Sequence, residues 1–230
     1  MSSRAAGLGL LLLASVGAAS GEPLALSSRS VVFKDRNVDI AVAYPHTGND
    51  VIDAALAAYA DRNAADFRKQ RPDFAHGDHR HVLDVTYSIE RNDGDLLAVH
   101  FTVYEDMGGL HGDSAFETFN FVLPAGRRIG LADIVDGQRG VDRVSQLAIA
   151  DLTSQLAQPD HVSDADWIRD GAGPEAENFT NVILEPHALR IWFAPYEVAA
   201  HAEGPRMVEI PLSALDDVLS PKWRDRSKPP

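Results

Sequence analysis

The first half of the chain is dominated by apolar residues at every second position, which is the spacing of a β-strand with one buried face. Residues 30–44 form one such run and predict a strand or a pair of strands. Residues 82–123 contain three more runs, separated by the turn signal Asp93-Gly94 and by a glycine-rich stretch. They predict a three-stranded antiparallel meander with one apolar face.

Between these two regions the apolar spacing changes to that of a helix. From Ile52 to Phe67, apolar side chains recur every three or four positions. Asn49 or Asp50 is the expected N-cap, and Pro72 ends the pattern. The sequence therefore predicts one long helix between the first strands and the meander.

The second half mixes both spacings in shorter segments. We expect a turn, a short strand and a short helix in residues 125–137, followed by an amphipathic helix over 141–156. A short helix is expected around Trp167, and two strands on either side of residues 185–188. Residues 206–219 predict a last strand and a short helix. The expected fold class is α+β, with antiparallel sheet(s) packed against a few helices.

The N-terminus has the layout of a secretory signal peptide, with Arg4, an apolar run and small residues before Gly21. The apolar run is shorter than the about 20 residues that a membrane-spanning helix needs. We therefore expect residues 1–21 to be a signal peptide, the protein to be periplasmic or secreted, and the mature chain to have no membrane span.

Composition narrows the chemistry. The 230 residues include no cysteine, which excludes disulfides, a thiolate nucleophile and a thiolate zinc site. The formal net charge is −13. Such a chain repels nucleic acid and suits a cationic partner, although net charge alone also serves solubility. No cofactor is expected, because no glycine-rich nucleotide-binding motif is present.

Two groups of residues are candidates for site chemistry. His76, Asp78, His79 and His81 are metal ligands by type and lie close together in sequence, so they form a weak candidate metal site, with a solvated loop as the alternative. Paired carboxylates, among them Glu105, Asp106, Glu117, Glu197 and Glu203, are what a glycoside hydrolase needs, but their separation is not visible in the sequence. No serine nucleophile motif is present, so we assign no catalytic residue.

The glycine-rich stretch between the second and third meander strands contains Gly108, Gly109, His111 and Gly112. Glycines suit a tight corner, because they adopt positive φ at little cost. A corner alone does not require the histidine. We expect His111 to hydrogen-bond within the corner, with contact to a ligand as the second possibility.

Two segments resemble a bacterial extracytoplasmic family, the PdaC/RsiV-like domains. "GGLHGDSAFETFNFVLPAGRRIGLADIV" is similar to the family's Gly-Gly-x-His-Gly corner, aromatic strand and helix start. "ENFTNVILEPHALRIWFAPYEVAAHAEGPRMVEIPLSAL" is similar to its C-terminal half, which includes a Pro-Tyr-x-Val-Ala motif and a Gly-Pro pair. The resemblance implies a PdaC-like part over residues 22–123, an RsiV-like part over 124–220 in the same body, and a loose tail over 221–230.

The resemblance also implies a function. The family includes the extracellular part of the RsiV anti-sigma factor, which binds lysozyme, and the non-catalytic N-terminal region of the peptidoglycan deacetylase PdaC. We therefore expect a stand-alone, non-catalytic module for a lysozyme-like basic protein or cell-wall glycan. A cell-wall hydrolase or deacetylase and a structural envelope protein remain as alternatives. The motifs give the candidate binding residues Gly108, Gly109, His111, Gly112, Tyr196, Glu197, Gly204 and Pro205.

Overall fold

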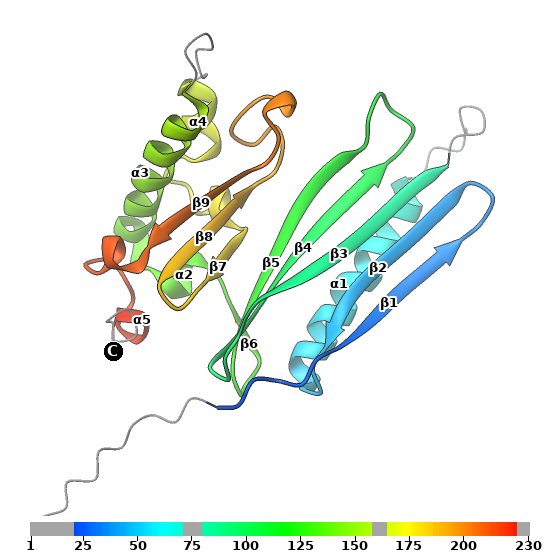
Figure 1. Cartoon of the computed structure of the whole chain (residues 1–230), viewed down its shortest axis with the longest axis horizontal. Coiled ribbons are helices and arrows are strands. Elements are labelled where there is room, and N and C mark those ends of the chain that lie inside the picture. The colour runs from blue at the N-terminus through cyan, green and yellow to red at the C-terminus, as the bar shows by residue number, and fades with distance from the viewer. Residues whose placement is uncertain (1–20, 71–79, 158–164, 225–230) are drawn as a thin grey trace, which may run out of the picture.

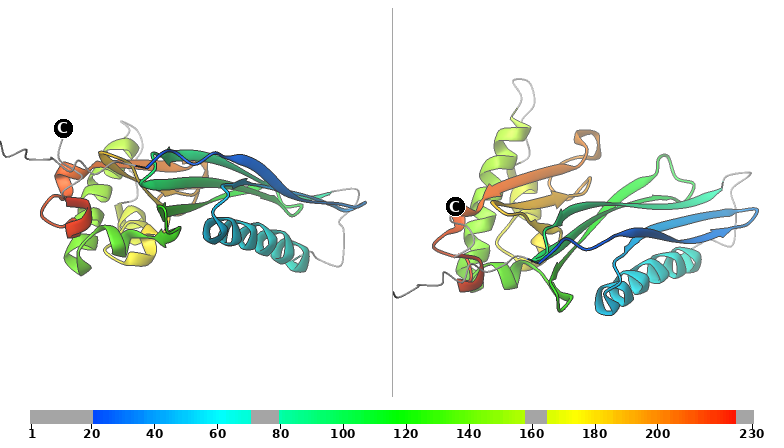
Figure 2. Two further views of the ribbon diagram at one scale, coloured as in Figure 1. Left: turned by 90° about the horizontal axis from the view of Figure 1, so that it is seen from below. Right: turned by 60° about the horizontal axis from the view of Figure 1, so that its bottom comes forward.

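A computed structural model of the chain describes residues 21–70, 80–157 and 165–224. These residues form the expected α+β fold, with two sheets and helices on one face of each (Figures 1 and 2). Within these ranges, the helices are too short or too polar to cross a membrane. The predicted signal peptide, apart from Gly21, and three residues of the histidine cluster, His76, Asp78 and His79, lie outside the described residues.

The first sheet has six strands in the order of the sequence. They are β1 (Ser27–Lys34), β2 (Val38–His46), β3 (His81–Asn92), β4 (Leu96–Asp106), β5 (Asp113–Val122) and β6 (Arg127–Ile129). Neighbouring strands are antiparallel except β2 and β3, which are parallel. The sequence pattern did not indicate this parallel pair, which follows from the long connection through a helix.

That connection is α1 (Asp50–Gln70), which covers one face of the first sheet (Figure 2, left). Asn49 is its N-cap, because the Asn49 side-chain oxygen accepts hydrogen bonds from the backbone N–H groups of Val51 (3.1 Å) and Ile52 (3.3 Å). The apolar side of α1, from Ile52 to Phe67, is buried against the sheet as its periodicity predicted.

The second sheet is an antiparallel meander of β7 (Val182–Leu184), β8 (Ala188–Phe193) and β9 (Arg206–Pro211). It packs against α3 (Gly137–Leu156). The shorter helices around it are α2 (Leu131–Ile134), α4 (Ala165–Gly171) and three 3₁₀ helices, η1 (Ala176–Phe179), η2 (His201–Glu203) and η3 (Leu212–Leu215). The expected last short helix is thus a 3₁₀ turn.

The first residues of the segment expected to be a loose tail are helical. Residues 221–224 form α5 (Pro221–Arg224) instead of a loose segment. Trp223 is only 3% exposed, and its indole N–H donates a hydrogen bond of 3.1 Å to the backbone oxygen of Asp133. A tryptophan in a polar stretch therefore anchors this segment to the second core, because its large ring gains by burial.

The two sheets meet along β4 and β5, where the expectation of a single apolar face was wrong. β4 is buried on both faces, since Leu97 and Val99 enter the first core whereas Leu96 and Ala98 enter the second. On the same side as Ala98, the His100 ring stacks on Trp192 of β8 with ring centroids 4.7 Å apart. Burial lowers the pKa of His100, against the opposing effect of Glu90.

One side chain extends hydrogen bonding from the first sheet to the second. Asn120 of β5 is 1% exposed. Its amide nitrogen donates to the Val182 backbone oxygen (2.8 Å), and its amide oxygen accepts from the Leu184 backbone N–H (3.0 Å). The Thr118 hydroxyl donates a second bond to the Val182 oxygen (2.9 Å). The Asn120 amide thus pairs with β7 as a neighbouring strand would.

We expect replacement of Asn120 by alanine to lower the free energy of unfolding by about 2–4 kcal/mol, because it removes two buried hydrogen bonds and leaves the Leu184 N–H without an acceptor. Thr118→Val should cost only about 1 kcal/mol, since the Val182 oxygen keeps its bond from Asn120. Urea unfolding of both variants measures the difference. Equal losses would contradict the assigned role of Asn120.

The buried His100 should make stability sensitive to acid. Its folded-state pKa lies below the ordinary value of 6.5, so the folded state binds this proton less readily than the unfolded state does. The stability associated with neutral His100 is present above pH 6.5 and is lost as the pH falls through the folded-state pKa. We expect His100→Phe, which keeps an aromatic ring beside Trp192, to lose less stability between pH 7 and pH 5 than the unmodified chain. Denaturant unfolding at both pH values tests this, with the exposed His187→Phe as control.

Candidate binding site

The structure places the two predicted binding segments at the same end of the molecule, although they connect strands of different sheets (Figure 1). Residues 107–112 connect β4 to β5, and residues 194–205 connect β8 to β9. We call these two connections the loop pair. The His111 ring stacks on the His201 ring, with centroids 4.2 Å apart and planes inclined by 22°. The Tyr196 ring lies 5.2 Å from the same His201 ring.

The three glycines of the first loop have different roles. Gly108 has φ of 84°, and its N–H donates to the Asp106 carboxylate at 2.9 Å. A Cβ on Gly112 would lie 2.4 Å from the hydroxyl oxygen of Tyr104, so this glycine leaves room for the tyrosine ring. Gly109 has neither a positive φ nor a close neighbour of this kind.

His111 makes the contact within the corner that the sequence led us to expect, and it also stays exposed. Its Nδ1 lies 3.1 Å from the Gly112 backbone oxygen and 3.5 Å from the Asp113 carboxylate. The side chain nevertheless remains 48% exposed. The ring is therefore held by contacts within the corner while it stays accessible at the surface.

The second loop is ordered by hydrogen bonds of its own. Tyr196 has φ of 73°, which is rare for a residue other than glycine. Its backbone oxygen accepts a bond of 2.8 Å from the indole N–H of Trp167. The Glu197 carboxylate accepts the Ala194 N–H at 2.7 Å, so it helps to close the loop. Gly204 has φ of 70°, and Pro205 is exposed.

Sequence reasoning did not single out two members of this cluster, His201 and Asp113. Asp113 is two residues from His111, a spacing that places both on the same side of an extended chain. His201 is followed by the Gly204-Pro205 pair. His201 and His111 are 90 residues apart in sequence, and neither local spacing nor periodicity predicts a contact over such a separation.

The loop pair exposes apolar surface. Leu110 is 104% exposed at the tip of the first loop, Tyr196 is 52% exposed, and Tyr104 beside Gly112 is 39% exposed. The aromatic residues Trp192 and Phe193 of β8, by contrast, face the sheet junction and the second core. Exposed aromatic and aliphatic groups at loop tips are typical of a surface that contacts a partner.

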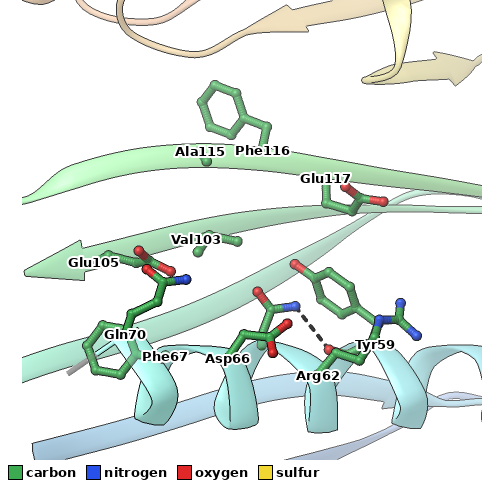
Figure 3. A pocket seen from close by; sticks show the side chains of 11 residues that line it. Tyr59, Arg62, Asp66, Phe67, Gln70, Val103, Glu105, Ala115, Phe116 and Glu117 are labelled. Carbon is green, nitrogen blue, oxygen red and sulfur yellow. Dashed lines mark hydrogen bonds between the residues drawn. The ribbon is translucent and has the colours of Figure 1, made fainter. Parts of the chain in front are cut away.

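A pocket of about 410 Å³ opens between α1 and the upper parts of β4 and β5 (Figure 3). Tyr59 and Phe67 line it from α1, and Glu105 and Glu117 line it from the strands, whereas the Phe116 ring points away toward His100 and the second sheet. Burial raises the pKa of Glu105, and repulsion from Asp113 adds to this effect. Burial also raises the pKa of the Tyr59 hydroxyl, which remains protonated at neutral pH.

The remaining carboxylates considered in the sequence are held by neighbours. Glu203 pairs with Arg206 at 3.1 Å, and Glu117 pairs with Arg128 at 2.9 Å. Of the predicted metal cluster, the structure describes only His81. This residue lies at the start of β3 and is 3% exposed, and its backbone N–H donates to the Asn37 oxygen at 2.8 Å. A metal site that includes His76, Asp78 and His79 remains a prediction.

The glycine assignments can be tested by two neighbouring substitutions. Gly108→Ala should lower the free energy of unfolding by about 1 kcal/mol, because alanine pays for a positive φ that glycine adopts freely. Gly109→Ala should change it by less than about 0.5 kcal/mol. Chemical denaturation of both variants supplies the comparison. A larger loss at position 109 would show that we have misassigned the turn.

Known proteins are similar to this chain in sequence and in fold. Residues 132–213 match the family model described as "Protein of unknown function (DUF3298)". Over 201 residues the chain is 26% identical to the peptidoglycan-N-acetylmuramic acid deacetylase PdaC of Bacillus subtilis. That alignment covers 86% of this chain but 43% of PdaC, so the chain spans less than half the length of this relative.

Two crystal structures of DUF3298 family proteins share the fold. The protein from Pseudomonas aeruginosa superposes with a TM-score of 0.62 over 87% of this chain and 96% of its own. The protein from Bacteroides fragilis gives 0.60 over 90% and 99%. Each is 16% identical to this chain, so the likeness is one of fold. The family resemblance expected from the sequence motifs is thereby confirmed: the chain is related to PdaC over most of its length, and its residues 132–213 match the DUF3298 family model.

Proposed function

We propose that the chain is a non-catalytic binding module of the bacterial cell envelope, and that its loop pair docks a basic, lysozyme-like protein. The observation that carries the proposal is the meeting of two loops from separate sheets, which together expose Leu110 and Tyr196. Relationship to PdaC and to the DUF3298 family fits a non-catalytic part of a cell-wall protein in an extracytoplasmic location.

The exposed side chains have the character of binding anchors. Tyrosine offers a large contact area with few rotatable bonds, and such residues often dominate the binding energy of an interface. The internal bonds of both loops hold Leu110 and Tyr196 in place before a partner arrives. Less conformational entropy is then lost on binding.

Charge favours a cationic partner. The chain carries −13 overall, and acidic side chains surround the loop pair, among them Asp106, Asp113 and Glu197. Arg206, the first residue of β9 after the second loop, is already paired with Glu203. Lysozymes of the C type are basic, so electrostatic attraction should accelerate the encounter and weaken as salt is added.

Cell-wall glycan is the second candidate, and the pocket between α1 and β5 favours it. Aromatic walls with carboxylates at the rim suit a sugar, which stacks on aromatic faces and donates hydrogen bonds through its hydroxyls. PdaC, a relative of this chain, is a peptidoglycan-N-acetylmuramic acid deacetylase by name. A hydrolase or deacetylase would use acidic residues such as Glu105, or the histidine cluster of His76 and His79, and a structural envelope protein would use neither surface.

The lysozyme proposal is tested by calorimetric titration of residues 22–230 with a C-type lysozyme at low and moderate salt. We expect micromolar or tighter affinity that weakens with salt. Leu110→Ala and Tyr196→Asn should each weaken binding by about fivefold or more, as expected for anchor residues. Asparagine is chosen at position 196 because it tolerates the positive φ.

Val32→Ala is the matched control, since Val32 is a 66% exposed aliphatic residue on β1, outside the loop pair. An equal loss in this variant, or no binding at either salt, would refute the docking surface. Sedimentation with purified peptidoglycan then tests the glycan candidate. Release of soluble products or acetate that stops in Glu105→Gln would favour the enzyme alternative.

A further inference from the structure

His111, Asp113 and His201 gather three metal-ligating side chains at the point where the two loops touch. One ligand atom from each lies within 4.8 Å of the other two. His111 Nδ1 and an Asp113 carboxylate oxygen are already 3.5 Å apart. Two atoms that bind one tetrahedral zinc ion at about 2.0–2.1 Å lie about 3.3 Å from one another, so this pair needs almost no movement.

We propose that these three residues bind one transition-metal ion of the zinc class and that the ion ties the loop pair together. Two imidazoles and one carboxylate form a donor set that suits Zn²⁺, Ni²⁺ or Cu²⁺, whereas Ca²⁺ and Mg²⁺ prefer oxygen ligands alone. Water completes the coordination, because the side chains are exposed or half-buried.

The surroundings of His111 favour a positive charge. Its Nδ1 faces two oxygen atoms, the Gly112 carbonyl at 3.1 Å and the Asp113 carboxylate at 3.5 Å. The other ring partner is the His201 imidazole, stacked at 4.2 Å. A metal ion bound at Nδ1 takes the place of the proton that this nitrogen donates to the Gly112 oxygen, and that proton moves to Nε2 or is released to water. The ion also needs a small rotation of the His201 ring, which presents its face to His111 in the stacked arrangement.

Both loops are built to hold these ligands. Gly112 leaves room for Tyr104 beneath the first loop. In the second loop, the Gly204 N–H donates to the His201 backbone oxygen at 2.9 Å, and the Glu203 N–H donates to the Ala200 oxygen at 2.9 Å. Fixed backbones at both ends reduce the entropy lost on binding, and this is the condition for a useful metal site.

The test is a zinc titration of tag-free residues 22–230 against a chromophoric chelator. The protein carries His76→Ala and His79→Ala, which remove the second histidine cluster of the sequence. We expect one equivalent of Zn²⁺ to bind with micromolar or tighter affinity. His111→Ala, Asp113→Asn and His201→Ala should each weaken it at least about tenfold, the scale on which loss of supporting groups at metal sites is felt. His201→Cys should retain binding, because a thiolate also ligates zinc.

His187→Ala is the matched control, since this exposed histidine lies in the turn between β7 and β8. Zinc should also raise the melting temperature of the parent but not of His201→Ala. Unchanged affinity in both His111→Ala and His201→Ala, or no binding up to millimolar zinc, would overturn the proposal. The inference does not rest on the proposed function, because zinc affinity is measured without lysozyme and either result can hold alone.

Discussion

The arrangement of this molecule depends on how two sheets that share no strand are fixed to each other. The central contact is the Asn120 amide, which donates to Val182 and accepts from Leu184 in a place where water is excluded. A buried polar group of this kind specifies a position more strictly than apolar contact does, because only one alignment of β5 and β7 satisfies both atoms. The stack of His100 on Trp192 supports the same alignment from the neighbouring strand.

This junction also determines where the loops at the far end of the two sheets lie. Once β5 and β7 are aligned, the β4–β5 and β8–β9 connections extend to the same end of the molecule (Figure 1). His111 and His201 meet there, in the connections that follow β4 and β8. The proposed docking surface and the proposed metal site are thus both consequences of an alignment set by residues that take no part in either.

Local pattern was enough for most elements of the fold. Alternation predicted the meander of β3, β4 and β5, and helical spacing predicted α1 and α3, because each of these elements carries a regular row of apolar side chains. It did not indicate that β4 is buried on both faces. It did not indicate the parallel pairing of β2 with β3, which depends on a helical crossover. The sequence pattern also did not predict the helix of residues 221–224, because one buried tryptophan, Trp223, in a polar stretch produces no detectable period.

The candidate site was half visible in the sequence for a related reason. Gly108 and Gly112 predict a tight corner, and Tyr196 belongs to the Pro-Tyr-x-Val-Ala motif. The meeting of His111 with His201 depends on the path of the intervening chain, which no short segment encodes. The role of Asn120 was not predictable for the same reason. The sequence shows an asparagine within an aromatic strand, but it does not show that this side chain hydrogen-bonds β7.

The junction has a consequence for how this chain is divided into units. The DUF3298 match begins at residue 132, yet Leu96, Ala98 and Ile129 are buried in the same core as the matched residues. Asn120 completes the hydrogen bonding of β7 from outside the matched segment. In this chain the segment matched by sequence is thus smaller than the segment that completes its core, because strands that precede residue 132 supply part of the core wall.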